Sequence, residues 1–231
     1  MTAIVVVAPV FLLAAGCTAL LIEDTGTASP SARGEGSDGL WMGHAWVDGQ
    51  HSTAELNVLI GRIQTAGIRD LFVHVGPLAD NGALDPRLRP DARQLTNALH
   101  RALPAVRVQA WLGGVVGSGR LNLAETSTRT NIVIAAQQVL GDGFDGIHYD
   151  LEPVPDGDPR LLALLDATRP ITTAAHAILS VAADQTEPLP DMATPAQWIV
   201  GHPHFWSTGY LHAVASTVDE VAIMAYDSGI P

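Results

Sequence analysis

The sequence contains no lysine. All 12 of its basic residues are arginines, and they stand against 24 acidic residues, for a formal charge of −12 over 231 residues. A Schiff-base aldolase needs a lysine amine, and so does a phosphate-binding loop of the Walker type, so both classes are excluded. A net-acidic chain without a cluster of arginines lacks the electrostatic footprint of a nucleic-acid-binding protein, and we expect no nucleic-acid partner. Cys17 is the single cysteine, so no disulfide can form within the chain.

Charged residues are also few, at 16% of the chain, whereas the apolar fraction of 47% is that of an ordinary globular protein. This composition argues against global disorder. The length fits one large domain or two small ones. No interior stretch has the composition of a linker, so we expect one folded domain over residues 39–231.

The start of the chain has the composition of an export or anchoring segment. Residues 3–22 are uncharged, and about 20 apolar residues suffice to span a bilayer or to form the core of a secretory signal. The residues that end at Cys17 resemble a bacterial lipoprotein cleavage box, in which the cysteine is lipidated. Residues 23–38 contain mostly Gly, Ser, Thr, Pro and charge, which is typical of a flexible linker and disfavours a buried helix before it. We therefore expect a signal peptide or membrane anchor over residues 1–22, and an extracytoplasmic domain that is tethered at the cell surface or secreted.

Six short apolar runs alternate with helical patterns in the rest of the chain. The runs begin at residues 40, 71, 106, 144, 178 and 221, so successive starts lie 31 to 43 residues apart. Helices are expected over residues 52–67, 91–103 and 128–140; the first opens with a capping box and ends at a glycine. Strands that alternate with helices predict a parallel sheet in an α/β protein.

One face of these expected strands is polar and aromatic. It carries Phe72 and His74 on the second strand, Gln109 and Trp111 on the third, and a polar series on the fourth. An open doubly wound sheet buries both faces and would be apolar throughout. A polar inner face near the strand ends is expected of a (β/α)8-type TIM barrel, whose C-terminal mouth carries the chemistry. An open six-unit α/β sheet is the alternative.

The polar series on the fourth strand consists of His148, Asp150 and Glu152. Because side chains alternate along a strand, all three point the same way, with successive members about 6 to 7 Å apart. Two nearby carboxylates repel each other, so one tends to hold a proton at neutral pH, which suits a general acid. A structural acidic cluster, or a cap for the following helix, is the non-catalytic interpretation.

Two motifs resemble glycoside hydrolase family 18, the chitinase-like barrels. The family pattern D-G-x-D-x-D-x-E at the end of the fourth strand is matched by the segment from Asp145 to Glu152, except that His148 replaces the middle aspartate. The segment from Met224 to Asp227 is similar to the family's M-x-Y-D on the sixth strand. A closed barrel needs eight strand–helix units, so we expect an incomplete barrel with six units and a C-terminal truncation.

The resemblance implies retaining hydrolysis of N-acetylglucosamine-containing glycans, in which the substrate's own 2-acetamido oxygen attacks the anomeric carbon. It implies that Glu152 protonates the leaving oxygen and that Asp150 orients the acetamido group. Tyr226 would hydrogen-bond the acetamido carbonyl, and Asp227 would contact the sugar near the cleavage point. His148 would stand beside Asp150, where an imidazole can accept or donate a hydrogen bond and can carry charge. No cofactor and no protein partner are expected.

Histidines and tryptophans near the strand ends allow two further interpretations. His44, His74 and His148, with Asp150 and Asp227, could hold a divalent metal as in amidohydrolase-type enzymes, but the first strand has no H-x-H pair and no bridging lysine is available. The simpler interpretation is that the histidines, with Trp46 and Trp111, line a sugar groove. A non-catalytic, lectin-like carbohydrate-binding barrel is the second alternative, and the presence of Glu152 favours an enzyme over it.

Overall fold

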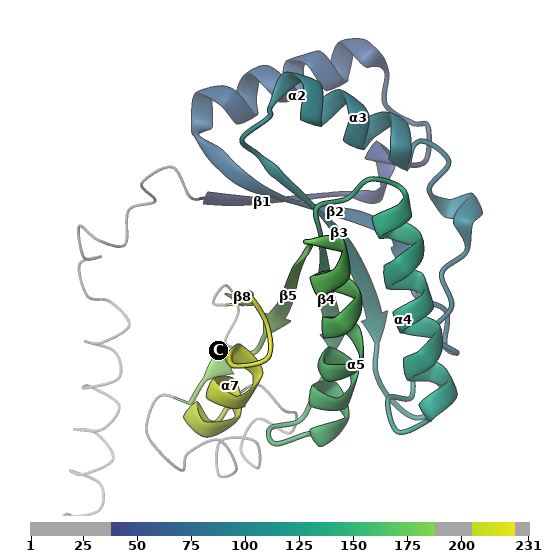
Figure 1. Ribbon diagram of the computed structural model, residues 1–231, viewed down its shortest axis with the longest axis vertical. Helices are drawn as coiled ribbons and strands as arrows, with labels where there is room; N and C mark the ends of the chain where they lie inside the picture. Colours follow the sequence, from purple (N-terminus) through teal and green to yellow (C-terminus); the bar gives the residue numbers. More distant parts are fainter. Residues whose placement is uncertain (1–37, 188–204, 225–231) are drawn as a thin grey trace, which may run out of the picture. The chain divides into compact units, whose positions relative to one another are not determined.

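The computed structural model describes residues 38–187 and 205–224, which form a curled parallel sheet with helices on its outer side (Figure 1). Every pair of neighbouring strands in the sheet is parallel. In spatial order the six strands are β1 (Asp38–Met42), β2 (Ile68–Pro77), β3 (Arg107–Val115), β4 (Gly146–Glu152), β5 (Ile178–Ala183) and β8 (Glu220–Ile223).

Helices connect the successive strands, as expected of repeated β–α units. They are α2 (Thr53–Ala66), α3 (Ala92–Ala102), α4 (Thr126–Gly141), α5 (Pro159–Ala175) and α7 (Thr208–Ala215), with short 3-10 turns η2 (His44–Trp46) and η3 (Pro86–Leu88). A separate two-stranded parallel pair joins β6 (Gln185–Thr186) to β7 (Phe205–Trp206). The three helices expected from the sequence are confirmed within two residues at each end, whereas α5 and α7 are additional.

The residues at the two ends of α2 cap the helix as the sequence predicts. Ser52 accepts a hydrogen bond from the backbone N–H of Glu55, and the Glu55 side chain accepts from the backbone N–H of Ser52. This reciprocal capping box satisfies two backbone donors that the first helical turn leaves free. At the other end Gly67 adopts a left-handed conformation, φ 68°, which glycine reaches without the steric cost that a Cβ adds.

The curvature of the sheet brings β3 and β8 together across its inner side. Two strands, β4 and β5, lie between them, so in a flat sheet they would be about 14 Å apart. Instead the Gln109 side chain on β3 donates to Glu220 Oε2 on β8 at 3.1 Å, and Arg107 reaches the same oxygen at 3.4 Å. The described residues therefore form a half-barrel, and the expected incomplete (β/α) TIM barrel is confirmed. β1 and β8 are the two end strands of this sheet and do not pair with each other.

The core lies between the sheet and its helices. Leu71, Val73 and Val75 of β2 and Ile147 of β4 are fully buried on the outer side of the sheet, where the sequence placed an apolar face. The helices cover this side with an apolar set: Leu95, Leu99, Ile132, Ala136, Val139, Leu161, Leu164 and Leu165. The other side of the sheet is thereby left to polar groups.

The expected signal peptide or membrane anchor, and most of the expected linker, lie outside the described residues. Among the helices of residues 38–187 and 205–224, none is both long enough and apolar enough to cross a membrane.

Candidate active site

The register between β2, β3 and β4 assembles five of the expected site residues toward the C-terminal ends of these strands. His74 pairs with Trp111, and Trp111 pairs with His148. Two and four residues further along β4, Asp150 pairs with Gly113 and Glu152 with Val115. Because paired residues in parallel strands point to the same face, these side chains share the inner side of the half-barrel.

A cleft of about 350 Å³ opens where these strands end. Asp150 and Glu152 line it, together with His74. The remaining lining residues come from the ends of β2 and β3 and from the loops that follow: Pro77, Leu78, Asp80, Gly113, Gly114, Val115 and Arg120. The expected acid pair therefore borders a space in which a ligand can be held.

Gly113 forms part of the cleft because it has no side chain. A Cβ at this position would lie 3.4 Å from Trp111 Nε1 and 3.5 Å from His74 Nε2. Without it, the buried indole nitrogen of Trp111 and the imidazole of His74 lie against the Gly113 backbone, near the main chain of Asp150. The sequence carries no signal for this role of Gly113, because a glycine within a strand pattern indicates only a bulge or a close approach of another backbone.

Burial raises the pKa values of the acid pair, Asp150 and Glu152, and charge repulsion raises that of Glu152 further. Burial raises the pKa of Asp150, and the indole N–H of Trp111 opposes this rise, although it makes no hydrogen bond of standard geometry within the described residues. Glu152 is exposed at the end of β4, but its carboxyl is partly buried where β4 ends at the cleft. Its pKa is raised to about 7, first by this burial, then by the charge of Asp150 and then by that of Asp184. A carboxyl group with a pKa near neutrality can donate a proton at neutral pH, as a general acid must.

His148 is neutral, and its ring hydrogen-bonds within the interior of the half-barrel. It is fully buried, and burial lowers its pKa to about 3. Its Nδ1 lies 2.8 Å from Ser180 Oγ, and Ser180 donates its hydroxyl hydrogen to Gln109 Oε1 at 2.6 Å. Because that hydrogen is already used, Nδ1 of His148 must be the donor, and Nε2 is the bare acceptor. Nε2 is buried without a partner in the described residues.

The hydrogen bonds from His148 continue downward into a charged layer. The Gln109 amide group donates to Asp70 Oδ1 at 3.3 Å and to Glu220 Oε2 at 3.1 Å. Arg107 pairs with the same two carboxylates. This layer fixes the amide orientation of Gln109, since a flipped amide would turn its oxygen toward two carboxylates. The tautomer of His148 is thus set by the charges of Asp70, Arg107 and Glu220, which lie near the N-terminal ends of their strands.

Not all expected site residues reach the cleft. Asp145 lies just before β4, at the opposite end of that strand from Glu152, and its carboxylate accepts hydrogen bonds from the Val108 backbone at 2.8 Å and from the His100 ring at 2.9 Å. Trp46 stacks on His51, with ring centroids 3.8 Å apart, and does not line the cleft.

The second motif is only partly described. Met224 follows β8 and donates its backbone N–H to Ala183 of β5 at 2.9 Å. Tyr226 and Asp227 lie outside the described residues, so the structure does not place them.

His44 and His74, unlike the fully buried His148, lie beside each other near the strand ends. The rings of His44 and His74 are in edge contact at 5.4 Å, and His74 also contacts Trp111 at 4.7 Å. Burial and the charge of His44 lower the pKa of His74. Within residues 38–187 and 205–224, no three His, Cys, Asp or Glu side chains are grouped so that they could hold a metal ion.

Arg120 is the cation on the rim of the cleft. A tight turn presents it, closed by Arg120 N–H donating to the Gly117 carbonyl at 3.2 Å. The turn is tied to β4, because Val116 N–H donates to the Glu152 carbonyl at 2.7 Å. No described residue forms an ion pair with Arg120, so its guanidinium is available to the cleft.

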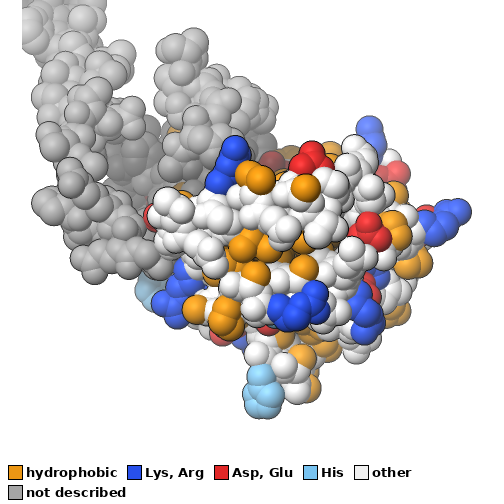
Figure 2. All heavy atoms as spheres, turned by 90° about the horizontal axis from the view of Figure 1, so that it is seen from above, with side chains coloured by type: hydrophobic (Ala, Val, Ile, Leu, Met, Phe, Trp, Pro, Cys, Tyr) orange, Lys and Arg blue, Asp and Glu red, His pale blue; other side chains and the backbone are white. Residues whose placement is uncertain are grey.

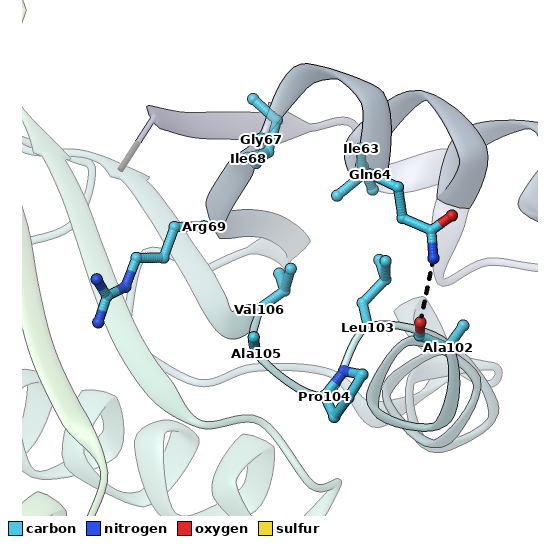
Figure 3. Close-up of a pocket in the computed structure, with 10 residues that line it drawn as sticks. All are labelled: Ile63, Gln64, Gly67, Ile68, Arg69, Ala102, Leu103, Pro104, Ala105 and Val106. Atoms are coloured by element: carbon cyan, nitrogen blue, oxygen red, sulfur yellow. Dashed lines mark hydrogen bonds between the residues drawn. The ribbon is translucent and has the colours of Figure 1, made fainter. Parts of the chain in front are cut away.

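A larger hollow, of about 530 Å³, lies at the other end of the strands (Figure 3). It is bordered by the C-terminal ends of α2 and α3 and by the starts of β2 and β3, and Gln64 donates across it to the Ala102 carbonyl at 3.4 Å. Arg69 is its only charged lining residue. Because it lacks acids, this hollow cannot supply general acid chemistry, and the smaller cleft is the candidate active site.

The face seen in Figure 2 shows no concentration of one charge. Arg side chains are interspersed there with Asp, Glu and apolar side chains.

No family model and no curated protein matches the sequence, but solved structures match the fold. The C-terminal domain of a putative chitinase from Desulfitobacterium hafniense DCB-2 aligns over 83% of this chain and 55% of its own length, with a TM-score of 0.62 and 17% identity. A family 18 chitinase from Cycas revoluta, solved with (GlcNAc)4, aligns over 82% of this chain and 54% of its own, with a TM-score of 0.55 and 19% identity. The Bacillus cereus spore cortex-lytic enzyme SleL aligns over 83% and 42%, with a TM-score of 0.57 and 15% identity.

These similarities define the class of fold. The chain has the fold of the family 18 chitinases and chitinase-like proteins, as its two motifs predicted. It spans about half of the length of these solved structures. At identities below 20% the likeness establishes the fold, and the chemistry rests on the site itself.

Proposed function

We propose that this chain carries the acid site of a glycoside hydrolase that acts on N-acetylglucosamine-containing glycans. The observation that carries the proposal is Glu152, whose pKa is raised to about 7 beside Asp150, in a cleft at the C-terminal mouth of a chitinase-like half-barrel. Related folds support the substrate class, because the Cycas revoluta chitinase was solved with (GlcNAc)4. A glycosidic oxygen needs a proton as it leaves, and a group that is half protonated at neutral pH can supply it.

The proposed mechanism uses the substrate as its own nucleophile. The 2-acetamido oxygen attacks the anomeric carbon while Glu152 gives its proton to the leaving oxygen. Water then attacks the cyclic intermediate, and the Glu152 carboxylate takes a proton from that water and regains its acid form. Asp150 would orient the acetamido N–H and stabilise the positive charge of the intermediate. Tyr226 and Asp227 remain proposed substrate contacts on the resemblance alone.

Two neighbouring residues support the role of Asp150. The Trp111 indole N–H opposes the effect of burial on the carboxylate, and Gly113 leaves the space beside it open. His148 does not perform the part expected of the family's middle aspartate, because its donor is directed to Ser180 and its ring is neutral. In this site Asp150 is therefore tuned by Trp111 and by burial.

Hydrolysis of a matched pair of chromogenic substrates tests this function. We expect the full chain to cleave a chitobioside and to leave the corresponding cellobioside, which lacks the 2-acetamido group, intact. Ready cleavage of the cellobioside would instead indicate a nucleophile supplied by the protein. Binding of chito-oligosaccharides without cleavage of either substrate would overturn the enzyme proposal in favour of the lectin-like alternative.

We also propose that the domain acts outside the cytoplasm, tethered by the apolar segment of residues 3–22. The proposal rests on that uncharged segment and on the polar spacer that follows it. The full chain should fractionate with membranes, and a variant that starts at Ser37 should be soluble. Cys17→Ser should release the full chain only if the cysteine carries the lipid. Recovery of both chains in the cytosol would contradict the proposal.

A further inference from the structure

Asp184 is a third carboxylate beside the acid pair, and nothing in the described structure gives it a structural role. It follows β5 directly, at the same end of the sheet as the cleft. Its side chain makes no hydrogen bond and no ion pair with any described residue. A partly buried carboxylate is costly to keep without a partner, so its position calls for another explanation.

The strand register places Asp184 next to Glu152. β4 and β5 pair with a constant offset, from Gly146 with Ile178 to Tyr149 with Val181. The same offset, continued by three residues, sets Glu152 opposite Asp184. In a parallel sheet neighbouring strands are about 4.8 Å apart, so the two carboxylates project from adjacent backbones.

The alternation of side chains puts Asp184 on the inner side of the half-barrel. Ser180 points inward, since its hydroxyl contacts Gln109 and His148. Residues two and four positions later share its face, so Ala182 and Asp184 also point inward. Asp184 therefore stands on the same face of the sheet as Glu152.

We propose that Asp184 is a positioning residue whose negative charge keeps the Glu152 carboxyl in its acid form at neutral pH. The inference rests on the proposed function, because it assigns a partner to the same general acid. No covalent step is involved: like charges on adjacent strands disfavour ionisation of the second group. The raised pKa of Glu152, to which Asp184 contributes after burial and Asp150, supports this arrangement. Burial raises the pKa of Asp184 itself to about 6, so it is ionised at pH 7 and above.

Other charged or titratable groups also border the cleft of Glu152. In the described part of the chain they are Asp150 on the same strand, His74 on β2, Asp80 in the loop after β2 and Arg120 in the turn after β3. Asp184 differs from these because it directly follows β5, which lies on the other side of β4 from β3. Its effect can be separated from theirs by changing it alone.

The test is a direct titration of Glu152 in the full chain, which does not depend on activity. Glutamate carboxyls are labelled with ¹³C, and the Glu152 resonance is assigned by its loss in Glu152→Gln. In Asp184→Asn we expect the Glu152 midpoint to fall by about one pH unit. Asp184→Glu, which keeps the charge, should keep the midpoint high. Asp166→Asn, which removes an equal charge from the exposed side of α5, should leave it unchanged.

An unchanged or raised midpoint in Asp184→Asn would overturn the proposal. If that variant does not fold by circular dichroism, Asp184→Ser makes the same comparison. For an active enzyme, the basic limb of the pH–rate profile should move down by the same unit, so that turnover at pH 8 falls about tenfold and turnover at pH 5 changes little. Absence of turnover in the wild type would contradict the proposed function, while the titration would still decide the role of Asp184.

Discussion

The ring of His148 donates from Nδ1 to Ser180 Oγ at 2.8 Å, across the boundary between β4 and β5. The bond places the ring hydrogen on Nδ1, because the Ser180 hydrogen is committed to Gln109, and burial keeps the ring neutral. It joins the strand that carries the acid pair to the charged layer below it. An imidazole thus occupies the place of a family aspartate without introducing a charge under the cleft.

The neutral state of His148 predicts a loss of stability at acidic pH. Its pKa is about 3 in the folded protein, below the ordinary histidine value of about 6.5, so only the unfolded chain binds this proton between those values. The contribution is fully present above pH 6.5 and is lost as pH falls toward 3. Between pH 6.5 and 5 the loss of this contribution should lower the free energy of unfolding by about 2 kcal/mol.

Urea unfolding at pH 7 and pH 5 checks this prediction. His148→Asn keeps a donor for Ser180 but cannot titrate, so its free energy of unfolding should fall less between the two pH values than that of the wild type. An equal fall in both proteins would show that His148 is not the group responsible.

Glu152 should contribute to stability with the opposite sign. Its folded pKa of about 7 lies above the ordinary glutamate value of 4.5, so its ionisation disfavours the fold at high pH. This penalty is fully present above pH 7 and disappears below pH 4.5. Glu152→Gln should therefore melt at a higher temperature than the wild type at pH 8 and at the same temperature at pH 4. A lower melting temperature at pH 8 would contradict the assignment, and Asp166→Asn controls for the change in net charge.

The charged layer below the cleft should be sensitive to the loss of Gln109. This residue is fully buried and joins Ser180 to Asp70 and Glu220. Gln109→Leu should cost about 1 to 3 kcal/mol for each buried group left without a partner, measured by urea unfolding. Gln64→Leu is the matched control, because it removes the same amide from an exposed position with one weak hydrogen bond. Equal effects of the two substitutions would argue against the layer.

The floor of the cleft can be filled at Gly113. A Cβ there meets its nearest neighbours at 3.4 and 3.5 Å, so Gly113→Ala should fold normally. The side chain of Gly113→Leu would extend into the space beside Asp150. We expect it to weaken chito-oligosaccharide binding about tenfold or more by calorimetry, equivalent to at least about 1.4 kcal/mol. Unchanged binding in a folded Leu variant would place the ligand elsewhere.

The fold was accessible from the sequence because its signals are local. Regularly spaced apolar runs, the capping box at Ser52 and the alternation from His148 to Glu152 each involve only neighbouring residues. The acid pair was accessible for the same reason. The spacing of these residues alone could not assign their roles, and the resemblance to family 18 supplied them.

What the sequence could not show depends on pairing between strands. Asp184 has no distinctive pattern in its own segment, and its proposed role depends on the β4–β5 offset, which sets it opposite Glu152 when continued past the last pair, Tyr149–Val181. Asp145 matches the motif, yet its carboxylate bonds the start of β3 and the α3 helix at the opposite end of β4. The charge state of His148 likewise could not be predicted without knowing its surroundings, because a histidine can be neutral or protonated.

Turnover by Glu152→Gln tests the central claim most directly, because glutamine keeps the shape of the side chain and removes its transferable proton. With a chromogenic chitobioside at pH 6, the variant should lose about 10² to 10⁴ in kcat relative to the wild type, the usual contribution of a general acid. Its circular dichroism spectrum and its binding of chito-oligosaccharides should be unchanged. Undiminished kcat in the variant would show that Glu152 is not the acid.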